Sequence, residues 1–170
     1  VKPTRVVAPR DVFDIKNLVS FARQKKVAGE NISLTARSAG TDMSGGPLSE
    51  SIILDLLPHF NTIKEVGSGH AIAEPGVYYR DFEKATLEIG LLMPSYPASR
   101  DLCTVGGMVA NNSGGEKTLI YGKVENYVRQ VKMVLADGGE YAFRPMSIVE
   151  IEKERTRTDF MGEVCRKMFE

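Results

Sequence analysis

The chain has 170 residues, of which 42% are hydrophobic and 26% are charged, as is ordinary for a globular domain. Its 22 basic and 22 acidic residues are interspersed and cancel, which excludes a broad positive field for nucleic acid or an anionic membrane. No apolar stretch approaches the roughly 20 residues of a transmembrane helix. We expect one compact unit in the cytoplasm, without a nucleic-acid partner or a transmembrane segment. A peripheral membrane contact stays open for the full-length protein.

Two cysteines and two histidines offer little chemistry of their own. Cys103 and Cys165 are far apart and form no Cys-x-x-Cys pair, so neither a disulfide framework nor a thiolate metal site is predicted. His59 and His70 have no second ligand type beside them at metal spacing, which favours structural roles for both. No metal site is expected, and a reducing compartment fits the cysteines best.

The first part of the chain has the pattern of a small βαββ lobe. Pro9-Arg10-Asp11 is a helix start, and apolar residues follow it at helical spacing. The predicted elements are, in order, a strand at 5–8, a helix at 12–22, a strand at 32–36, a loop of small residues at 38–47 and a buried strand at 51–57. This lobe covers about residues 1–57.

The middle of the chain predicts a second lobe, about 58–145. Its predicted elements are a strand pair at 63–66 and 71–73, a helix at 78–89, a short helix-like turn at 104–112, and a hairpin of strands at 127–136 and 140–143. Beyond Pro145 the composition changes to a charged helical tail with helices at 148–155 and 160–169. We interpret residues 146–170 as a connection to a missing substrate domain.

A first loop of small residues joins two predicted strands. Residues 37–46 are Arg-Ser-Ala-Gly-Thr-Asp-Met-Ser-Gly-Gly. Small residues let backbone N–H groups approach an anion closely, and Thr41 and Ser44 add hydroxyl donors, so a diphosphate fits this chemistry. A hairpin loop also collects Gly, Ser and Asp for its turn geometry. Both interpretations stay open for this loop taken alone.

A second cluster spans residues 104–115, with the sequence Thr-Val-Gly-Gly-Met-Val-Ala-Asn-Asn-Ser-Gly-Gly. Four glycines and several small polar residues make a poor core and a good cofactor wall. The alternative is a pair of ordinary turns around a short helix. Two such clusters in one short chain favour a cofactor site.

Two competing nucleotide motifs fail when read letter by letter. Gly67-Ser68-Gly69 begins a G-x-G-x-x-G fingerprint, but Ile72 takes the place of its last glycine, so a Rossmann NAD site is not expected. In 115–118, Glu116 separates the glycine from the lysine and breaks the Walker G-K-[ST] geometry, so a P-loop nucleotidase is not expected either.

The two loops together resemble the FAD-binding domain of the vanillyl-alcohol oxidase and p-cresol methylhydroxylase superfamily. The resemblance is strongest to its D-lactate dehydrogenase and glycolate oxidase large-subunit branch. Residues 37–41 match the R-G-G-G-T diphosphate loop of that family, and 95–122 match its P-x-S, C-T-x-G-G-x-x-A-x-N-x-G-G and Y-G series in order. Residues 131–138 are similar to its E-V-V-L-A-D-G strand, with Lys132 in the place of the glutamate.

The resemblance implies an α+β fold, namely a two-lobed FAD-binding domain of the p-cresol methylhydroxylase type over residues 1–170. The small parallel lobe would be followed by a larger mixed or antiparallel sheet with flanking helices. The residues implied to bind FAD are Arg37, Ser38, Ala39, Gly40, Thr41, Asp42, Pro97, Thr104, Gly106, Gly107, Asn112, Gly114, Gly115, Tyr121 and Val128. Ser38 and Ala39 replace family glycines, so a positive φ at either position would be strained.

The resemblance also implies that FAD is held without a covalent bond. Thr41 stands where relatives with a histidyl link carry His, and Cys103 precedes Thr104 as in relatives that bind FAD non-covalently. The full-length parent is expected to be an FAD-linked oxidase or dehydrogenase that oxidises a 2-hydroxy acid, such as D-lactate or glycolate, by hydride transfer to flavin. The catalytic residues are not identified, and the fragment alone is expected to be inactive.

Two other functions stay open. The first is a non-catalytic flavin-binding or electron-relay module whose partner chain supplies the rest of the site. The second is a reductase of the same superfamily that acts on a nucleotide-sugar enol ether with NADPH as the electron donor. In all three cases the cofactor is FAD.

Overall fold

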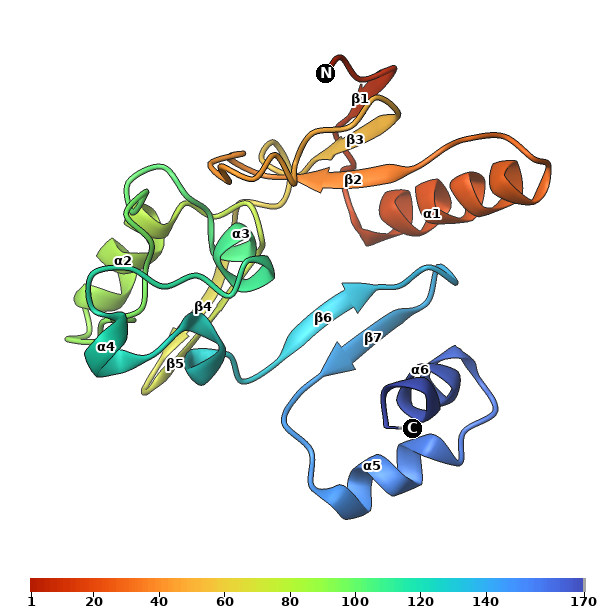
Figure 1. Cartoon of the computed structure of the whole chain (residues 1–170). Coiled ribbons are helices and arrows are strands. Elements are labelled where there is room, and N and C mark those ends of the chain that lie inside the picture. The colour runs from red at the N-terminus through yellow and green to blue at the C-terminus, as the bar shows by residue number, and fades with distance from the viewer. Residues whose placement is uncertain (170) are drawn as a thin grey trace.

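The computed structural model of the chain describes residues 1–169, which form an α+β fold (Figure 1). The helices are α1 (Val12–Val27), α2 (Tyr79–Leu87), α3 (Val105–Ala110), α4 (Thr118–Tyr121), α5 (Ile148–Arg155) and α6 (Phe160–Met168), with the 3-10 helix η1 (Val124–Tyr127). The strands are β1 (Arg5–Val7), β2 (Leu34–Arg37), β3 (Ile52–Asp55), β4 (Ile63–Gly67), β5 (His70–Ala73), β6 (Val131–Val134) and β7 (Glu140–Phe143). The predicted α+β class is confirmed.

The small parallel βαββ lobe has the strand order β1-β3-β2. Val6 and Thr35 both pair with Ile53, so the last strand in sequence is the middle strand of the sheet. Its apolar residues Ile52, Ile53 and Leu54 are buried, as is typical of a central strand in a parallel sheet. α1 begins where the Asp11 carboxylate accepts the N–H of Asp14 at 2.9 Å, as expected of a helix cap.

The core of the second lobe is built around α2. Its buried residues are Val77, Tyr79, Phe82, Tyr96, Cys103, Met108 and Val124. Tyr79 is fully buried, and its hydroxyl donates to the carbonyl oxygen of Met93 at 2.6 Å. The hydrogen bond satisfies the polar end of this ring, and the core buries its apolar body. Both contacts fix α2 against the segment that leads into α3.

The expected larger sheet consists of two separate antiparallel hairpins, β4–β5 and β6–β7. No strand pairing joins the two hairpins within residues 1–169. The strand expected at 127–136 begins only at Val131, because residues 124–127 form the 3-10 helix η1. In that helix the Tyr127 hydroxyl donates to the carbonyl oxygen of Tyr121 at 2.9 Å, and this bond holds the chain in a turn.

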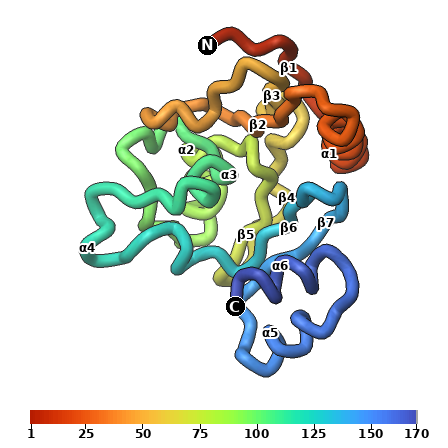
Figure 2. The backbone as a smooth tube through the Cα atoms, turned by 45° about the vertical axis from the view of Figure 1, so that its right-hand side comes forward, coloured from red at the N-terminus to blue at the C-terminus, as the bar shows by residue number. Residues whose placement is uncertain are grey.

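The β6–β7 hairpin lies beside α1 in both ribbon views (Figures 1 and 2). Lys16 on α1 pairs with Glu140 at the start of β7 at 3.1 Å. At the hairpin turn Gly138 has φ +84°, and a Cβ there would lie 3.2 Å from the hydroxyl oxygen of Ser20. The turn therefore contacts the helix of the first lobe closely.

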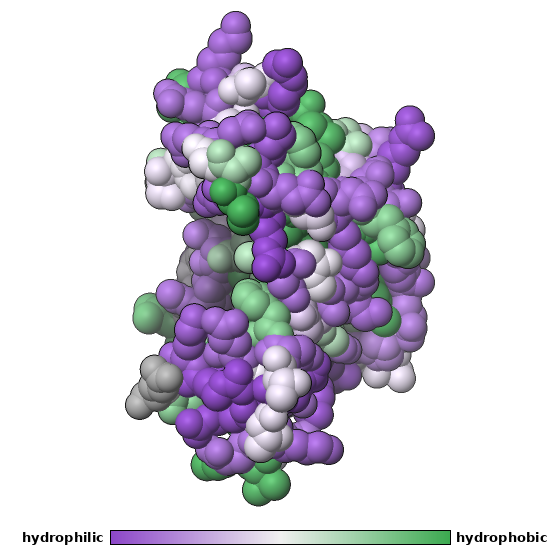
Figure 3. Space-filling model, turned by 90° about the vertical axis from the view of Figure 1, so that its right-hand side faces the viewer, coloured by the Kyte–Doolittle hydropathy of each residue, from purple (hydrophilic) through white to green (hydrophobic). Residues whose placement is uncertain are grey.

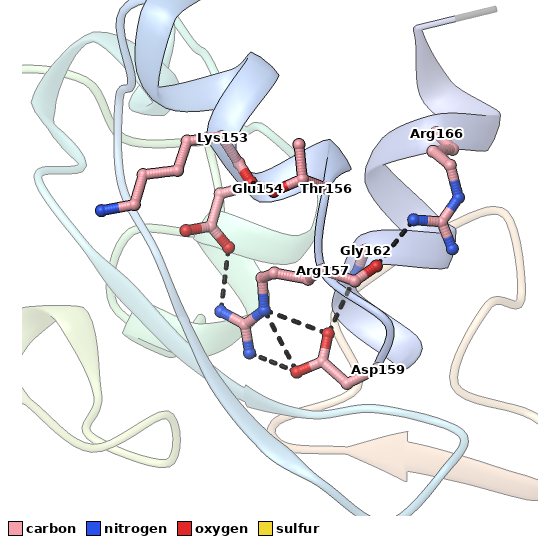
Figure 4. Close-up of polar contacts among 7 residues, drawn as sticks. All are labelled: Lys153, Glu154, Thr156, Arg157, Asp159, Gly162 and Arg166. Atoms are coloured by element: carbon pink, nitrogen blue, oxygen red, sulfur yellow. Dashed lines mark hydrogen bonds and ion pairs between the residues drawn. The ribbon is translucent and has the colours of Figure 1, made fainter.

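The two C-terminal helices pack against each other through a network of arginines (Figure 4). Arg157 donates to Glu154 at 2.9 Å and to Asp159 at 3.0 Å, while Arg166 donates to the carbonyl oxygen of Arg157 at 2.7 Å. Gly162 lies against that same carbonyl, where a Cβ has no room. These contacts set the corner between α5 and α6.

The face that Figure 3 shows is mostly hydrophilic, with hydrophobic residues in separate small groups. None of the helices described in residues 1–169 is long and apolar enough to cross a lipid bilayer. Within the same residues no three His, Cys, Asp or Glu side chains are grouped as they would be around a metal ion.

Candidate cofactor site

The loop after β2 presents a run of unpaired backbone donors. The N–H groups of residues 38–43, six in succession, donate to no acceptor in the part of the chain that the structure describes. These residues are half-buried or exposed, so a ligand can reach them. Consecutive free N–H groups of this kind bind anionic oxygens, and a diphosphate offers several such oxygens in a row. The arrangement therefore fits the diphosphate interpretation better than a closed hairpin turn.

The backbone of this loop has one left-handed residue among 37–43, which is Gly40 with φ +68°. Ser38 and Ala39 have no positive φ, so their replacement of family glycines causes no strain. The Arg37 guanidinium folds over the Cα of Gly40, in the space that a Cβ would fill. Because the side chain of Arg37 has no hydrogen-bond or ion-pair partner in residues 1–169, its charge is available to an anion beside the free N–H groups.

The N-terminus of α3 offers no second anion site. The N–H of Val105 donates to Val77 at 2.8 Å, and that of Gly106 donates to Pro75 at 2.9 Å. Thr104 caps the helix by accepting the N–H of Gly107 at 3.3 Å. With these three donors occupied, the N-terminus of α3 has no free N–H among residues 105–107 to offer an anion, unlike the β2 loop.

The paired glycines of α3 have different surroundings. A Cβ at Gly106 would lie 2.7 Å from the Cα of Pro75, so this glycine is required for packing. A Cβ at Gly107 would meet only the capping hydroxyl of Thr104, at 3.2 Å, and Gly107 is exposed. Both ribbon views place the β2 loop next to α3 (Figures 1 and 2). Of Thr104, Gly106 and Gly107, only Gly107 offers an open surface to a ligand there.

The Asn112–Gly115 corner is held by local contacts. Asn112 is the one non-glycine residue with a positive φ, 43°, among those described, and its side-chain oxygen accepts the N–H of Glu125 at 3.0 Å. Gly115 lies against the backbone carbonyl of Tyr96. A Cβ built on Gly115 would be 3.3 Å from the Cα of Pro97. The structure thus brings Pro97 and Gly115 together.

Three further predicted residues lie around this corner. Gly114 packs on the side chain of Thr118, whose hydroxyl accepts the N–H of Gly115 at 2.7 Å. Tyr121 is 45% exposed at the end of α4, whereas Val128 is half-buried against the second core. Tyr121 therefore has a ring that a ligand can contact. Within residues 1–169, Val128 mainly packs against the core of the second lobe.

A supporting pair was missed from the sequence. Glu83 on α2 has a side chain only 10% exposed and accepts the Nε–H of Arg100 at 3.1 Å. Arg80, also on α2, donates to the backbone carbonyl of Asp101. Together they hold the segment that leads into α3. A signal was available, because Glu83 falls on the same helical face as Phe82 and Thr86, which are buried.

Three other reactive groups, Cys103, His70 and Lys117, are buried or in contact with another side chain. The Cys103 thiol is buried, and this burial raises its pKa. His70 faces Glu65 at 3.0 Å across the β4–β5 turn, a partner that the sequence did not reveal. Lys117 lies 5.3 Å from the ring centroid of Tyr96.

The family model described as "FAD binding domain" matches residues 3–142. The chain is 33% identical over 140 residues to the glycolate oxidase subunit GlcD of Bacillus subtilis, covering 80% of this chain and 28% of that protein. It is 34% identical over 135 residues to the D-lactate dehydrogenase of Archaeoglobus fulgidus, covering 78% of this chain and 29% of that protein.

Among solved structures, alkyldihydroxyacetonephosphate synthase matches with a TM-score of 0.69 at 21% identity, over 86% of this chain and 28% of that one. This likeness concerns the fold, which is of the p-cresol methylhydroxylase type. The chain spans less than a third of the length of each of these three proteins.

Proposed function

Since the chain belongs to the family of FAD binding domains, we propose that it is the cofactor-holding part of an oxidoreductase that oxidises a small 2-hydroxy acid, such as D-lactate or glycolate. The observation that carries the proposal is the run of six free N–H groups at 38–43, with the cation of Arg37 beside it. The two relatives named above act on molecules of this class according to their names.

In this proposal the β2 loop binds the diphosphate of FAD through its backbone donors. Gly107 and the Pro97–Gly115 corner form the wall nearer the flavin end. The bound flavin supplies the capacity to accept a hydride. The chain's own residues orient the cofactor and exclude water from its diphosphate, while the substrate and its proton acceptor are held by the rest of the polypeptide.

We keep the division of the chain as part of the proposal. A first lobe of about 1–57 supplies the diphosphate loop, a second lobe of about 58–145 supplies the flavin wall, and 146–170 connects to the substrate-binding part. The two free cysteines are compatible with the reducing cytoplasm that we expect. The electron acceptor is not assigned.

The cofactor part of the proposal is tested by titrating the chain with FAD and with FMN in a calorimeter. FMN has a single phosphate, so FAD should bind more tightly because it alone can use the full donor run. At about 100 times its dissociation constant, FAD should add roughly 2.7 kcal/mol to the free energy of unfolding. A thermal melt that FAD leaves unchanged would contradict the proposal.

The substrate part is tested by comparing this chain with the whole polypeptide that contains it. The whole polypeptide should reduce a dye acceptor with D-lactate or glycolate, whereas the FAD-loaded chain should not. Positioning of the reacting atoms contributes about 7 to 11 kcal/mol to lowering a barrier, and this contribution needs the substrate-binding part. Turnover by the chain alone would show that the catalytic groups lie within residues 1–170.

A further inference from the structure

Asp42 lies within the diphosphate loop, yet its carboxylate faces the loop itself. It accepts the hydroxyl of Ser44 at 2.6 Å, the N–H of Ser44 at 3.2 Å and the N–H of Gly46 at 2.9 Å. The Ser44 hydroxyl, followed by the N–H of Gly46, holds the pKa of Asp42 below its usual range. The charge of Asp42 is therefore already compensated by three donors of its own loop.

Gly46 is the residue that makes this arrangement fit. A Cβ at Gly46 would lie 2.8 Å from a carboxylate oxygen of Asp42, closer than carbon and oxygen normally approach. Gly46 has a φ outside the left-handed region, so backbone conformation is not what requires a glycine here. The close approach of the carboxylate does require one.

The backbone N–H groups of the loop therefore fall into two sets. The N–H groups of Ser44 and Gly46 are used by Asp42, and those of 38–43 remain free. A bare carboxylate at this place would repel a diphosphate, since like charges at short range raise the free energy of binding. A carboxylate with three internal donors repels less and also fixes the path of the chain.

We infer that Asp42 is a positioning residue: its carboxylate binds Ser44 and Gly46 and so holds residues 38–43 in the shape that receives the FAD diphosphate, without itself contacting the cofactor. This inference rests on the proposed function and deepens it, because a loop that is already shaped loses less entropy when the ligand binds. It gives the Asp42 carboxylate a role of its own, while the expected contact of Asp42 with FAD through its backbone N–H stays a prediction.

The test compares Asp42→Ala, Asp42→Asn, Gly46→Ala and the double variant Asp42→Ala/Gly46→Ala. Gly46 has no side chain to offer a ligand, so its substitution reaches the cofactor only by displacing Asp42. Each single alanine variant should weaken FAD binding about tenfold, and the double variant should be no weaker than Asp42→Ala, since both changes remove the same hydrogen bonds of Asp42. Asp42→Asn keeps an acceptor oxygen and should recover part of the affinity.

Two readouts separate positioning from a general loss of structure. FMN affinity, which does not depend on the whole donor run, should stay within about twofold of the wild type in all these variants. In the FAD-free chain, the amide proton resonances of Ser44 and Gly46 should shift in Asp42→Ala. Ser68→Ala, at the exposed β4–β5 turn, is the matched control for loss of a loop side chain and should bind FAD normally.

Equal weakening of FAD and FMN, normal FAD binding by Gly46→Ala, or unshifted Ser44 and Gly46 amides in Asp42→Ala would each overturn the inference alone. Absence of FAD binding by the wild-type chain would overturn the proposed function and this inference with it. The amide resonances distinguish the two failures, because they report the hydrogen bonds of Asp42 without any cofactor.

Discussion

Gly106 on α3 packs against Pro75, so that a Cβ at the glycine would lie 2.8 Å from the proline carbonyl oxygen. At the neighbouring Gly107 a Cβ would meet only the Thr104 hydroxyl, at 3.2 Å. Two adjacent glycines of the same motif therefore have different reasons to be glycine. Gly106 is required for packing in the interior, and Gly107 leaves the exposed surface of α3 free of a side chain.

The matched pair Gly106→Val and Gly107→Val should separate these roles. Gly106→Val should destabilise the chain by about 3 kcal/mol or more, because the new side chain meets backbone that cannot move aside. Gly107→Val should leave the free energy of unfolding within about 1 kcal/mol and abolish FAD binding, because its side chain fills space that the proposed cofactor wall leaves to the flavin end. Urea unfolding and FAD titration measure the two effects. Unchanged FAD affinity in a folded Gly107→Val variant would show that α3 is not part of the cofactor wall.

The ion pair between Glu83 and Arg100 should respond asymmetrically to substitution. Arg100→Met leaves a carboxylate that is only 10% exposed without its partner, whereas Glu83→Gln leaves an arginine that is 43% exposed and can be hydrated. We expect a loss of about 3 kcal/mol for Arg100→Met and about 1 kcal/mol for Glu83→Gln in urea unfolding. Equal losses would mean that the carboxylate is better solvated than its burial indicates.

Helix α5 should weaken in acid through Glu150. Arg144 and the Ser147 cap lower the pKa of this carboxyl from its ordinary 4.5 to about 2. A lowered folded-state pKa means that the stabilisation is fully present above pH 4.5 and is lost as the pH falls from 4.5 through about 2. The Ser147 amide proton should therefore titrate with a midpoint near 2, and Glu150→Gln should remove this titration. A midpoint near 4.5 would show that the capping box does not form in solution.

Bound flavin should leave the protein when it is denatured. Thr41 has a hydroxyl in place of an imidazole, and the Cys103 thiol is 4% exposed with a raised pKa, so neither is a ready nucleophile. After acid precipitation of the FAD-loaded chain, the yellow colour should remain in the supernatant. Flavin fluorescence that migrates with the denatured protein band would reveal a covalent link.

The sequence predicted most elements because their signals are local. Pro9 and the capping Asp11 mark the start of α1, and the Asp137-Gly138-Gly139 turn marks the β6–β7 hairpin. The strand expected from Tyr127 was wrong at its beginning, since β propensity there is overruled by the turn of η1. The short helix α4 was not predicted, because four residues leave no periodicity to detect.

The composition of the two loops located the candidate site, but not the part that each residue has in it. Whether an N–H group is free depends on which acceptor is near it in space, as for Gly106, whose donor is used by Pro75. In the same way, the sequence places Asp42 in the first loop, and only the structure shows that its carboxylate accepts hydrogen bonds from that same loop. Such distinctions are properties of tertiary packing.

The placement of β3 between β1 and β2 also determines when the β2 loop can take shape during synthesis. A nascent chain that ends before Ile52 contains both outer strands of the sheet and no strand for either to pair with. Since pairings between distant segments form late, the loop that joins β2 to β3 gains its second anchor only when the middle strand has been inserted. The free N–H groups of residues 38–43 therefore cannot be arranged in advance of the residues that close the sheet.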